Sequence, residues 1–187
     1  VPRMLARALL LCSLLVALLI PASASAGGVG FFNGTGVHSG GALSQAGGRG
    51  TWVNEGGGVE IFLGKRDFRL HGRLRFGYNA VLDVTPLAEG AVAKNRVTHA
   101  GVISLGAKVE LLPDIEKAFG LYVVADIGVA PLVKYGRGYL FVDVGPGARV
   151  NVNQVFQLFA ELTGMLRYEN GFTGGALLFL GARFSFD

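Results

Sequence analysis

The sequence contains little that could form a disulfide or a lipid anchor. One cysteine is present among 187 residues, and charged residues make up only 16% of the chain. The cysteine, Cys12, lies in an apolar N-terminal stretch, and the residue before it is Leu11, where lipoprotein signals carry a small residue. We therefore expect neither a disulfide in the mature chain nor a lipid anchor.

The histidines and the net charge exclude further classes of site. The three histidines lie far apart in the sequence, and without a mature cysteine they predict no metal site. The formal net charge of +4 is too small to indicate nucleic-acid binding. The glycine runs at 56–58 and 145–147 lack the Lys-Ser/Thr ending of a phosphate-binding loop. No metal, cofactor or nucleic-acid partner is expected.

Long apolar runs are absent after the first part of the chain. Hydrophobic residues make up 51% of the sequence, yet no later segment approaches the ~20 apolar residues of a membrane helix. At the start, Arg3 and Arg7 precede a largely apolar run that ends in Ala-Ser-Ala, the pattern of a cleaved secretory signal. We predict a signal peptide at 1–26 and a single domain at 27–187 that begins with Gly27.

Residues 68–79 alternate with a period of two. The even positions are Phe68, Leu70, Gly72, Leu74, Phe76 and Tyr78, and the odd positions are Arg69, His71, Arg73, Arg75, Gly77 and Asn79. Successive side chains of a strand point to opposite faces, whereas a helix would mix the two sets. The segment therefore predicts a strand with one apolar and one basic face.

Six further segments separate into an apolar and a polar or glycine series in the same way. The seven predicted strands cover residues 58–64, 68–79, 101–111, 120–129, 140–151, 156–167 and 175–186. Some apolar residues fall on the polar series, namely Phe62, Val102, Val124, Phe141, Phe159, Leu177 and Phe179. An eighth strand at 29–37, where glycines and a Phe-Phe pair blur the alternation, gives the even count that a bacterial membrane barrel requires.

The connections predict how the strands are joined. Outer-membrane barrels alternate short periplasmic turns with longer outer loops, and we expect outer loops at 39–56 and 80–96 with a two-residue turn at 65–66 between them. Proline cannot donate to a strand ladder and is typical of bulges. We therefore predict a bulge around Pro146. The fold class is all-β, a single antiparallel up-and-down transmembrane barrel.

The composition of the polar series indicates which face lies inside. It combines glycines with long charged side chains and contains one clear lysine, Lys108, unlike a solvated outer surface. Its acids and bases nearly balance, and pairing lowers the cost of confining charge. The charge network expected in the lumen comprises Glu60, Arg69, His71, Arg73, Arg75, Lys108, Glu110, Asp126, Asp143, Arg149, Glu161, Arg167 and Arg183.

The predicted turn at 65–66 also gives a register. It would place Glu60 across from His71 and diagonally near Arg69 and Arg73. An anion path along the arginines is one interpretation, but an eight-stranded barrel is only wide enough for its own side chains. We therefore expect a filled lumen, with the anion pore as the alternative.

The whole mature chain resembles a known family of barrels, and its C-terminal end illustrates the resemblance. The alternating, aromatic-ended residues 181–186, Gly-Ala-Arg-Phe-Ser-Phe followed by Asp187, resemble the last strand of the small outer-membrane barrels typified by the OmpA transmembrane domain and the OmpX and Ail group. The resemblance implies insertion by the barrel assembly machinery, contact with outer-membrane lipid, and a role as envelope anchor, adhesin or resistance factor.

Aromatic residues near the expected strand ends fit the two lipid interfaces. They are Phe68, Phe119, Phe156 and Phe186 at the inner side and Trp52, Tyr78, Tyr135, Tyr168 and Phe172 at the outer side.

The function that these features favour is a non-enzymatic role in the bacterial outer membrane, structural or through an extracellular partner. Loops on rigid scaffolds commonly hold function, and the expected contact surface is His38, Arg49, Trp52, Glu55, Asp83, Glu89, Lys94 and Arg96. A lipid-modifying enzyme is an alternative, but His38 and His99 form no arrangement of nucleophile, base and orienting group. A soluble lipocalin-like carrier, in which the two faces exchange roles, is the third alternative.

Overall fold

The computed structural model describes residues 27–39, 51–64, 69–83, 97–112, 118–132, 138–168 and 172–186. They form eight strands, β1 (Gly27–Ser39), β2 (Thr51–Leu63), β3 (Leu70–Asp83), β4 (Val97–Glu110), β5 (Phe119–Pro131), β6 (Gly138–Asn151), β7 (Phe156–Tyr168) and β8 (Phe172–Phe186). The predicted signal peptide at 1–26 lies outside the described residues. Within the described ranges, no helix has the length and apolar character needed to cross a membrane.

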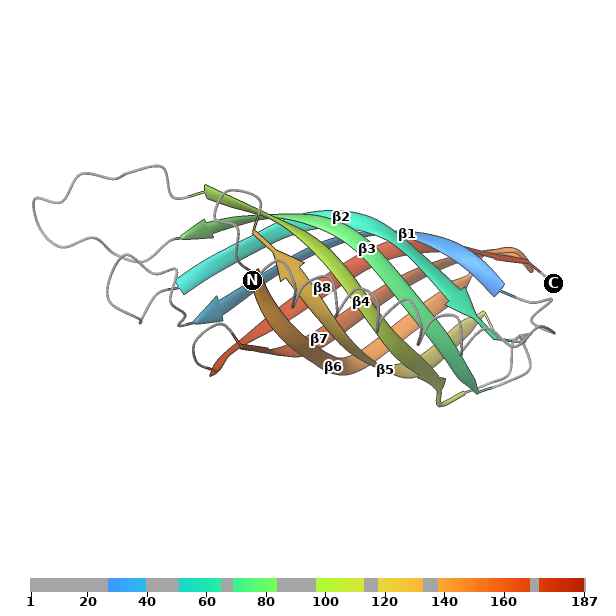
Figure 1. Cartoon of the computed structure of the whole chain (residues 1–187). Coiled ribbons are helices and arrows are strands. Elements are labelled where there is room, and N and C mark those ends of the chain that lie inside the picture. Colours follow the sequence, from blue (N-terminus) through green and yellow to red (C-terminus); the bar gives the residue numbers. More distant parts are fainter. Residues whose placement is uncertain are drawn as a thin grey trace, which may run out of the picture.

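The strands close into one antiparallel barrel in sequence order (Figure 1). Each strand pairs with the next along the chain, and β1 closes the barrel by pairing with β8 from Gly27 opposite Phe186 to Ser39 opposite Gly174. We call the end of the barrel at Gly27 and Phe186 the base and the opposite end the rim. The predicted all-β barrel is confirmed. The additional strand predicted at 29–37 is also confirmed: it is β1, and it is longer than predicted.

Alternation along each strand decides which side chains face out. In β6, Leu140 and Val144 are 54% and 49% exposed, while Asp143 and Arg149, on the opposite face, are 3% and 2% exposed. Exposed large apolar side chains occur on all eight strands. Soluble monomers rarely show so much contiguous apolar surface, whereas a membrane barrel turns such a band to the lipid. The outer face is therefore the lipid-facing face of a transmembrane barrel.

The register between β2 and β3 differs from the predicted one. Glu60 lies opposite Arg75 rather than His71, because the connection between Leu63 and Leu70 is longer than the predicted two-residue turn at 65–66. The prediction of Glu60 across from His71 is wrong by four residues. An even shift keeps every side chain on its own face, so Glu60 still points into the lumen.

The predicted bulge at Pro146 is also wrong. Between β6 and β7, Val144 lies opposite Gly164 and Gly147 opposite Glu161, so both strands contribute the same number of residues over this stretch. Pro146 lies opposite Val123 of β5, where the register is continuous. The strand therefore accommodates the proline, which has no N–H, without an inserted residue. Gly145 and Pro146 have no partners on β7, but both are paired with β5.

Several strands extend further toward the rim than predicted. The first outer loop was expected at 39–56, but β2 already begins at Thr51. The second was expected at 80–96, but β3 continues to Asp83. Both stretches remain paired with a neighbouring strand, β2 with β1 and β3 with β4. Backbone pairing with a neighbouring strand therefore keeps these residues in β-strands, although their side chains do not alternate clearly between apolar and polar.

Candidate functional site: the charged lumen

The lumen contains a cluster of charged side chains near its middle, contributed by five strands. We call this the central cluster, and it consists of Glu60, Arg73, Arg75, Tyr122, Asp126, Glu161 and Arg183. Every one of these side chains is at most 3% exposed. Each stands on the polar series of its strand, so strand periodicity alone brings all seven to the inside.

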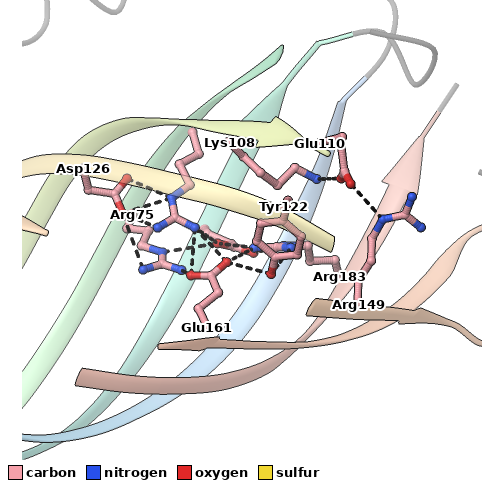
Figure 2. A network of polar contacts seen from close by, with 10 residues as sticks. Arg75, Lys108, Glu110, Tyr122, Asp126, Arg149, Glu161 and Arg183 are labelled. Carbon is pink, nitrogen blue, oxygen red and sulfur yellow. Dashed lines mark hydrogen bonds and ion pairs between the residues drawn. The ribbon is translucent and has the colours of Figure 1, made fainter. Parts of the chain in front are cut away.

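Glu161 of β7 is the centre of this cluster (Figure 2). Its carboxylate accepts hydrogen bonds from Arg73 Nη1 at 2.9 Å, Arg183 Nη2 at 2.6 Å and Tyr122 Oη at 2.9 Å. Arg75 Nη2 donates a further one to Glu161 Oε2. One carboxylate therefore joins β3, β5, β7 and β8 across the lumen.

The two other acids of the central cluster bind the remaining guanidinium nitrogens. Asp126 accepts from Arg73 Nε at 2.8 Å and from Arg73 Nη2. Glu60 accepts from Arg75 Nε at 3.3 Å and from Arg183 Nε. Three guanidinium groups thus face three carboxylates, and the cluster is neutral. Buried charge is tolerated only when it is paired and hydrogen-bonded in this way.

A second group of charges lies closer to the base. Lys108 Nζ forms an ion pair with Glu110 Oε1 at 2.8 Å, and Arg149 Nε donates to Glu110 Oε2 at 3.3 Å. Arg149 Nη1 donates to Asn151 Oδ1 at 2.6 Å. Figure 2 shows this group beside Tyr122 and Arg183, so the charged side chains form one band along the lumen.

Aromatic rings on the polar series pack against these cations. The Arg183 guanidinium lies over Phe159 at 3.9 Å from the ring centroid, and Arg75 lies over Phe179 at 4.6 Å. Lys108 Nζ lies 5.6 Å from the centroid of Phe62. Such contacts favour a desolvated cation. They explain why aromatic residues interrupt the polar series in the sequence.

The rim half of the lumen is more apolar than predicted. Ala100, Ala130, Leu132, Tyr139, Phe141, Met165 and Leu177 form a buried cluster there, with Val102 and Phe179 against it. The prediction of a polar lumen therefore holds only in part for this half, which buries this apolar cluster beside polar side chains such as His38, Asn54 and Arg167. Four of the seven residues that interrupt the polar series belong to this cluster or pack against it, namely Val102, Phe141, Leu177 and Phe179, and they fill space between the charged side chains and the rim.

Twelve of the thirteen residues of the expected charge network are buried in the barrel. Arg69 is the exception: it is exposed and precedes β3, because the longer β2–β3 connection ends after it. His71 and Asp143 are buried but belong to neither charged group described above. Arg167 of β7 contacts His38 Nε2 at 2.8 Å and lies 3.9 Å from the centroid of Tyr139.

The expected contact surface at the rim is dispersed in the structure. His38 and Trp52 are each 2% exposed, and their rings lie edge to face inside the rim. Placing them in an accessible loop was wrong, and so was assigning Trp52 to the outer aromatic belt, because both stand on inward positions of paired strands. Glu55 is exposed on β2 and Asp83 ends β3. Arg49, Glu89, Lys94 and Arg96 lie outside the described residues.

Apart from Trp52, the described residues of the predicted aromatic belts lie on outward positions; Phe156 is half-buried and packs on Phe184 with ring centroids 5.0 Å apart. Phe119 and Phe186 are 49% and 55% exposed near the base, and Tyr168 and Phe172 are 49% and 73% exposed near the rim. Tyr78 is exposed and stacks on His99 with ring centroids 5.5 Å apart. Phe68 and Tyr135 lie outside the described residues.

The expected charge network did not include Tyr122, although its position on the inward series of β5 was a usable signal. Its hydroxyl bridges Arg183 at 3.0 Å and Glu161 at 2.9 Å. Asn151, which accepts a hydrogen bond from Arg149, is also absent from the expected network, which consists of charged residues and one histidine. Parity along a strand identifies inward residues whatever their type, and a buried tyrosine hydroxyl needs a partner.

Comparison with known proteins gives a fold and no closer relationship. No family model matches the chain, and no curated protein matches it. The structure is similar to that of Neisserial surface protein A (NspA), with a TM-score of 0.52 and 13% identity, over 84% of this chain and 96% of that one. It is similar to Ail, the attachment invasion locus protein of Yersinia pestis, with a TM-score of 0.51 and 13% identity, over 87% and 99%.

These two similarities extend over nearly the whole length of both barrels. They agree with the closed eight-stranded topology described above. The resemblance predicted from the last strand is confirmed at the level of the fold. The chain has the transmembrane fold of the small eight-stranded outer-membrane β-barrels.

Proposed function

We propose that the protein is a non-enzymatic component of the bacterial outer membrane, a closed barrel that anchors its rim loops at the cell surface. The observation that carries the proposal is the combination of an apolar outer face with a lumen closed by paired charges. The apolar outer face is buried in lipid, and the central cluster stabilises the folded barrel. Functional contacts are thereby left to the rim, where loops on a rigid scaffold commonly hold function.

The geometry of the central cluster argues against an ion path. Side chains from β2, β3, β5, β7 and β8 meet at Glu60 and Glu161, and their hydrogen bonds cross the lumen. An ion that passed would have to separate buried pairs, and removing one partner of such a pair costs ~3–5 kcal/mol. Above the cluster, the apolar residues around Phe141 and Leu177 occupy the lumen.

The proposal includes two partners that follow from the outer face. Outer-membrane lipid is the solvent of the exposed apolar band, and the barrel assembly machinery is the partner during insertion. Phe184 and Phe186 on β8 are 38% and 55% exposed at the base, which suits the aromatic-ended last strand that the family resemblance implies. An extracellular partner at the rim is the third.

Membrane fractionation and bilayer recordings test the proposal. The protein should sediment with the outer membrane, need detergent for solubility, and give no steady current in planar bilayers in which a reconstituted porin conducts. Incubation with labelled lipopolysaccharide should leave its acyl chains intact by mass spectrometry. Steady anion-selective currents would establish a pore instead, and loss of acyl chains would establish an enzyme.

Loop replacement tests the surface role. A short Gly-Ser turn in place of residues 40–50 or, separately, 84–96 should leave the folded barrel intact, as judged by the shift in gel mobility on heating. At least one replacement should reduce surface binding or envelope integrity. An unchanged phenotype for both would remove these loops from the proposal.

A further inference from the structure

A small cavity lies in the lumen between the central cluster and the rim. Its volume is about 30 Å³, room for about two water molecules or one small ion with a water, since one water needs roughly 10–15 Å³ by this measure. The polar residues that line it are Asn54, Arg75, Asn79, Ser104 and Asp143, and the apolar ones include Phe32, Phe141 and Phe179.

Two of the residues that line this cavity each have a buried side-chain oxygen without a hydrogen-bond partner. These oxygens are Oδ1 of Asp143 and Oδ1 of Asn54, and each of these residues is 3% exposed. Ser104, another lining residue, is 4% exposed. An unpartnered buried acceptor costs about 1–3 kcal/mol, and more when it is charged. The cavity therefore contains a set of oxygen ligands that calls for a donor or a cation.

Asp143 has no arginine of its own: Arg73 and Arg75 lie close enough to act on its charge, but both form their ion pairs with the acids of the central cluster. Its partner across the strands is Asp126, which has the same sign and is already bound by Arg73. Arg75 lines the inner side of the cavity, but its guanidinium donates to Glu60 and Glu161. Among the described residues, no salt bridge reaches Asp143, whereas the three acids of the central cluster are matched by three arginines.

We propose that this cavity binds a monovalent cation of about the size of potassium or ammonium, with Asp143 as the charged ligand. Carboxylate, amide and hydroxyl oxygens are the ligands that hard cations prefer. A divalent ion would leave excess positive charge beside Arg75, because the cavity offers one carboxylate. The rings of Phe32 and Phe179 already face the Arg75 guanidinium, so the oxygen atoms are the ligands on which this site depends.

The cation should stabilise the folded barrel, because the unfolded chain has no such site. We would measure the melting temperature of the detergent-solubilised protein in KCl, NH4Cl, NaCl and choline chloride at equal ionic strength. Choline is too large for a cavity of about 30 Å³. We expect a melting temperature about 2–5 °C higher in KCl or NH4Cl than in choline chloride, and a comparison of KCl with NH4Cl and NaCl identifies the preferred ion.

Two variants locate the effect. Asp143→Asn keeps the shape of the side chain and should abolish the difference between the salts. Glu110→Gln removes a carboxylate of the group nearer the base and should lower the melting temperature equally in every salt. A salt difference that survives in Asp143→Asn, or that disappears in Glu110→Gln, would overturn the assignment to this cavity.

A direct measurement does not depend on either variant. Crystals of the wild-type protein soaked in thallium(I), which replaces potassium, should give an anomalous peak in the cavity beside Asp143 Oδ1. A wild-type melting temperature that is equal in all four salts, together with an empty cavity in the thallium-soaked crystals, would overturn the proposal and assign a proton to Asp143 instead.

Discussion

Replacing Glu161 by glutamine should destabilise the barrel more than any other single carboxylate change. Glu161 is 1% exposed and accepts hydrogen bonds from Arg73, Arg75, Tyr122 and Arg183. Glutamine has almost the same shape, so no cavity is created. It removes one negative charge from a cluster of three arginines and three acids, which leaves one buried guanidinium uncompensated.

The expected loss in the free energy of unfolding is ~3–5 kcal/mol, the cost of removing one partner from a buried ion pair. With a slope of about 1–3 kcal/mol per molar urea, this corresponds to a midpoint lower by roughly 1–5 M. The assay is reversible urea unfolding in lipid vesicles, followed by the fluorescence of Trp52, the single tryptophan, which is buried at the rim.

The matched control is Glu55→Gln, the same chemical change at an exposed position of β2. It should not lower the stability, because Glu55 points outward near the rim and loses a charge there without leaving a buried partner unpaired. A double variant, Glu161→Gln with Arg75→Met, should recover part of the loss because it restores neutrality in the cluster. If Glu161→Gln were as stable as Glu55→Gln, the central cluster would contribute no net stability and the reasoning would be refuted.

Two further substitutions test the packing of the lumen and the direction of the outer face. A Cβ atom at Gly147 would lie 2.3 Å from the Tyr122 ring, so Gly147→Ala should lower the stability by about 1–3 kcal/mol in the same urea assay. Gly164→Ala, where the nearest atom would be 3.8 Å away, should be tolerated, and equal effects of the two changes would contradict the packing described. Ile127 is 62% exposed on the outer face, so Ile127→Arg should cost ~2–4 kcal/mol in vesicles if this position faces the bilayer midplane, while Ile127→Leu should be neutral. A stable Ile127→Arg variant would mean that this face does not meet lipid.

Much of the fold could be predicted from local sequence. The alternation in segments such as 140–151 and 156–167 identified the strands, and parity within each strand assigned Asp143 and Glu161 to the inside. The count of eight strands followed from the even number expected of a bacterial membrane barrel and required the blurred segment at 29–37 to be a strand. The weaker predictions lay at the rim, where β2 and β3 continue past their clear alternation because neighbouring strands still pair with them.

The partners of the charged residues could not be predicted in this way. Glu60 was assigned to His71 from an assumed turn, whereas the structure places it opposite Arg75. Arg73 and Glu161, which contact each other directly, are 88 residues apart in the sequence. Their contact depends on the register of every strand between them and on the closure of β1 against β8.

The sequence by itself determined which side chains face lipid and which face the lumen, because a strand repeats every two residues and an even shift in register leaves each residue on its face. Only the tertiary structure decided which arginine meets which acid, and that the rim half of the lumen combines an apolar cluster with one carboxylate, Asp143, that forms no salt bridge with a described residue. Those outcomes depend on the register of each of the eight strands against its neighbours. Connection lengths and barrel closure set this register, and the register cannot be read from the local pattern of residues.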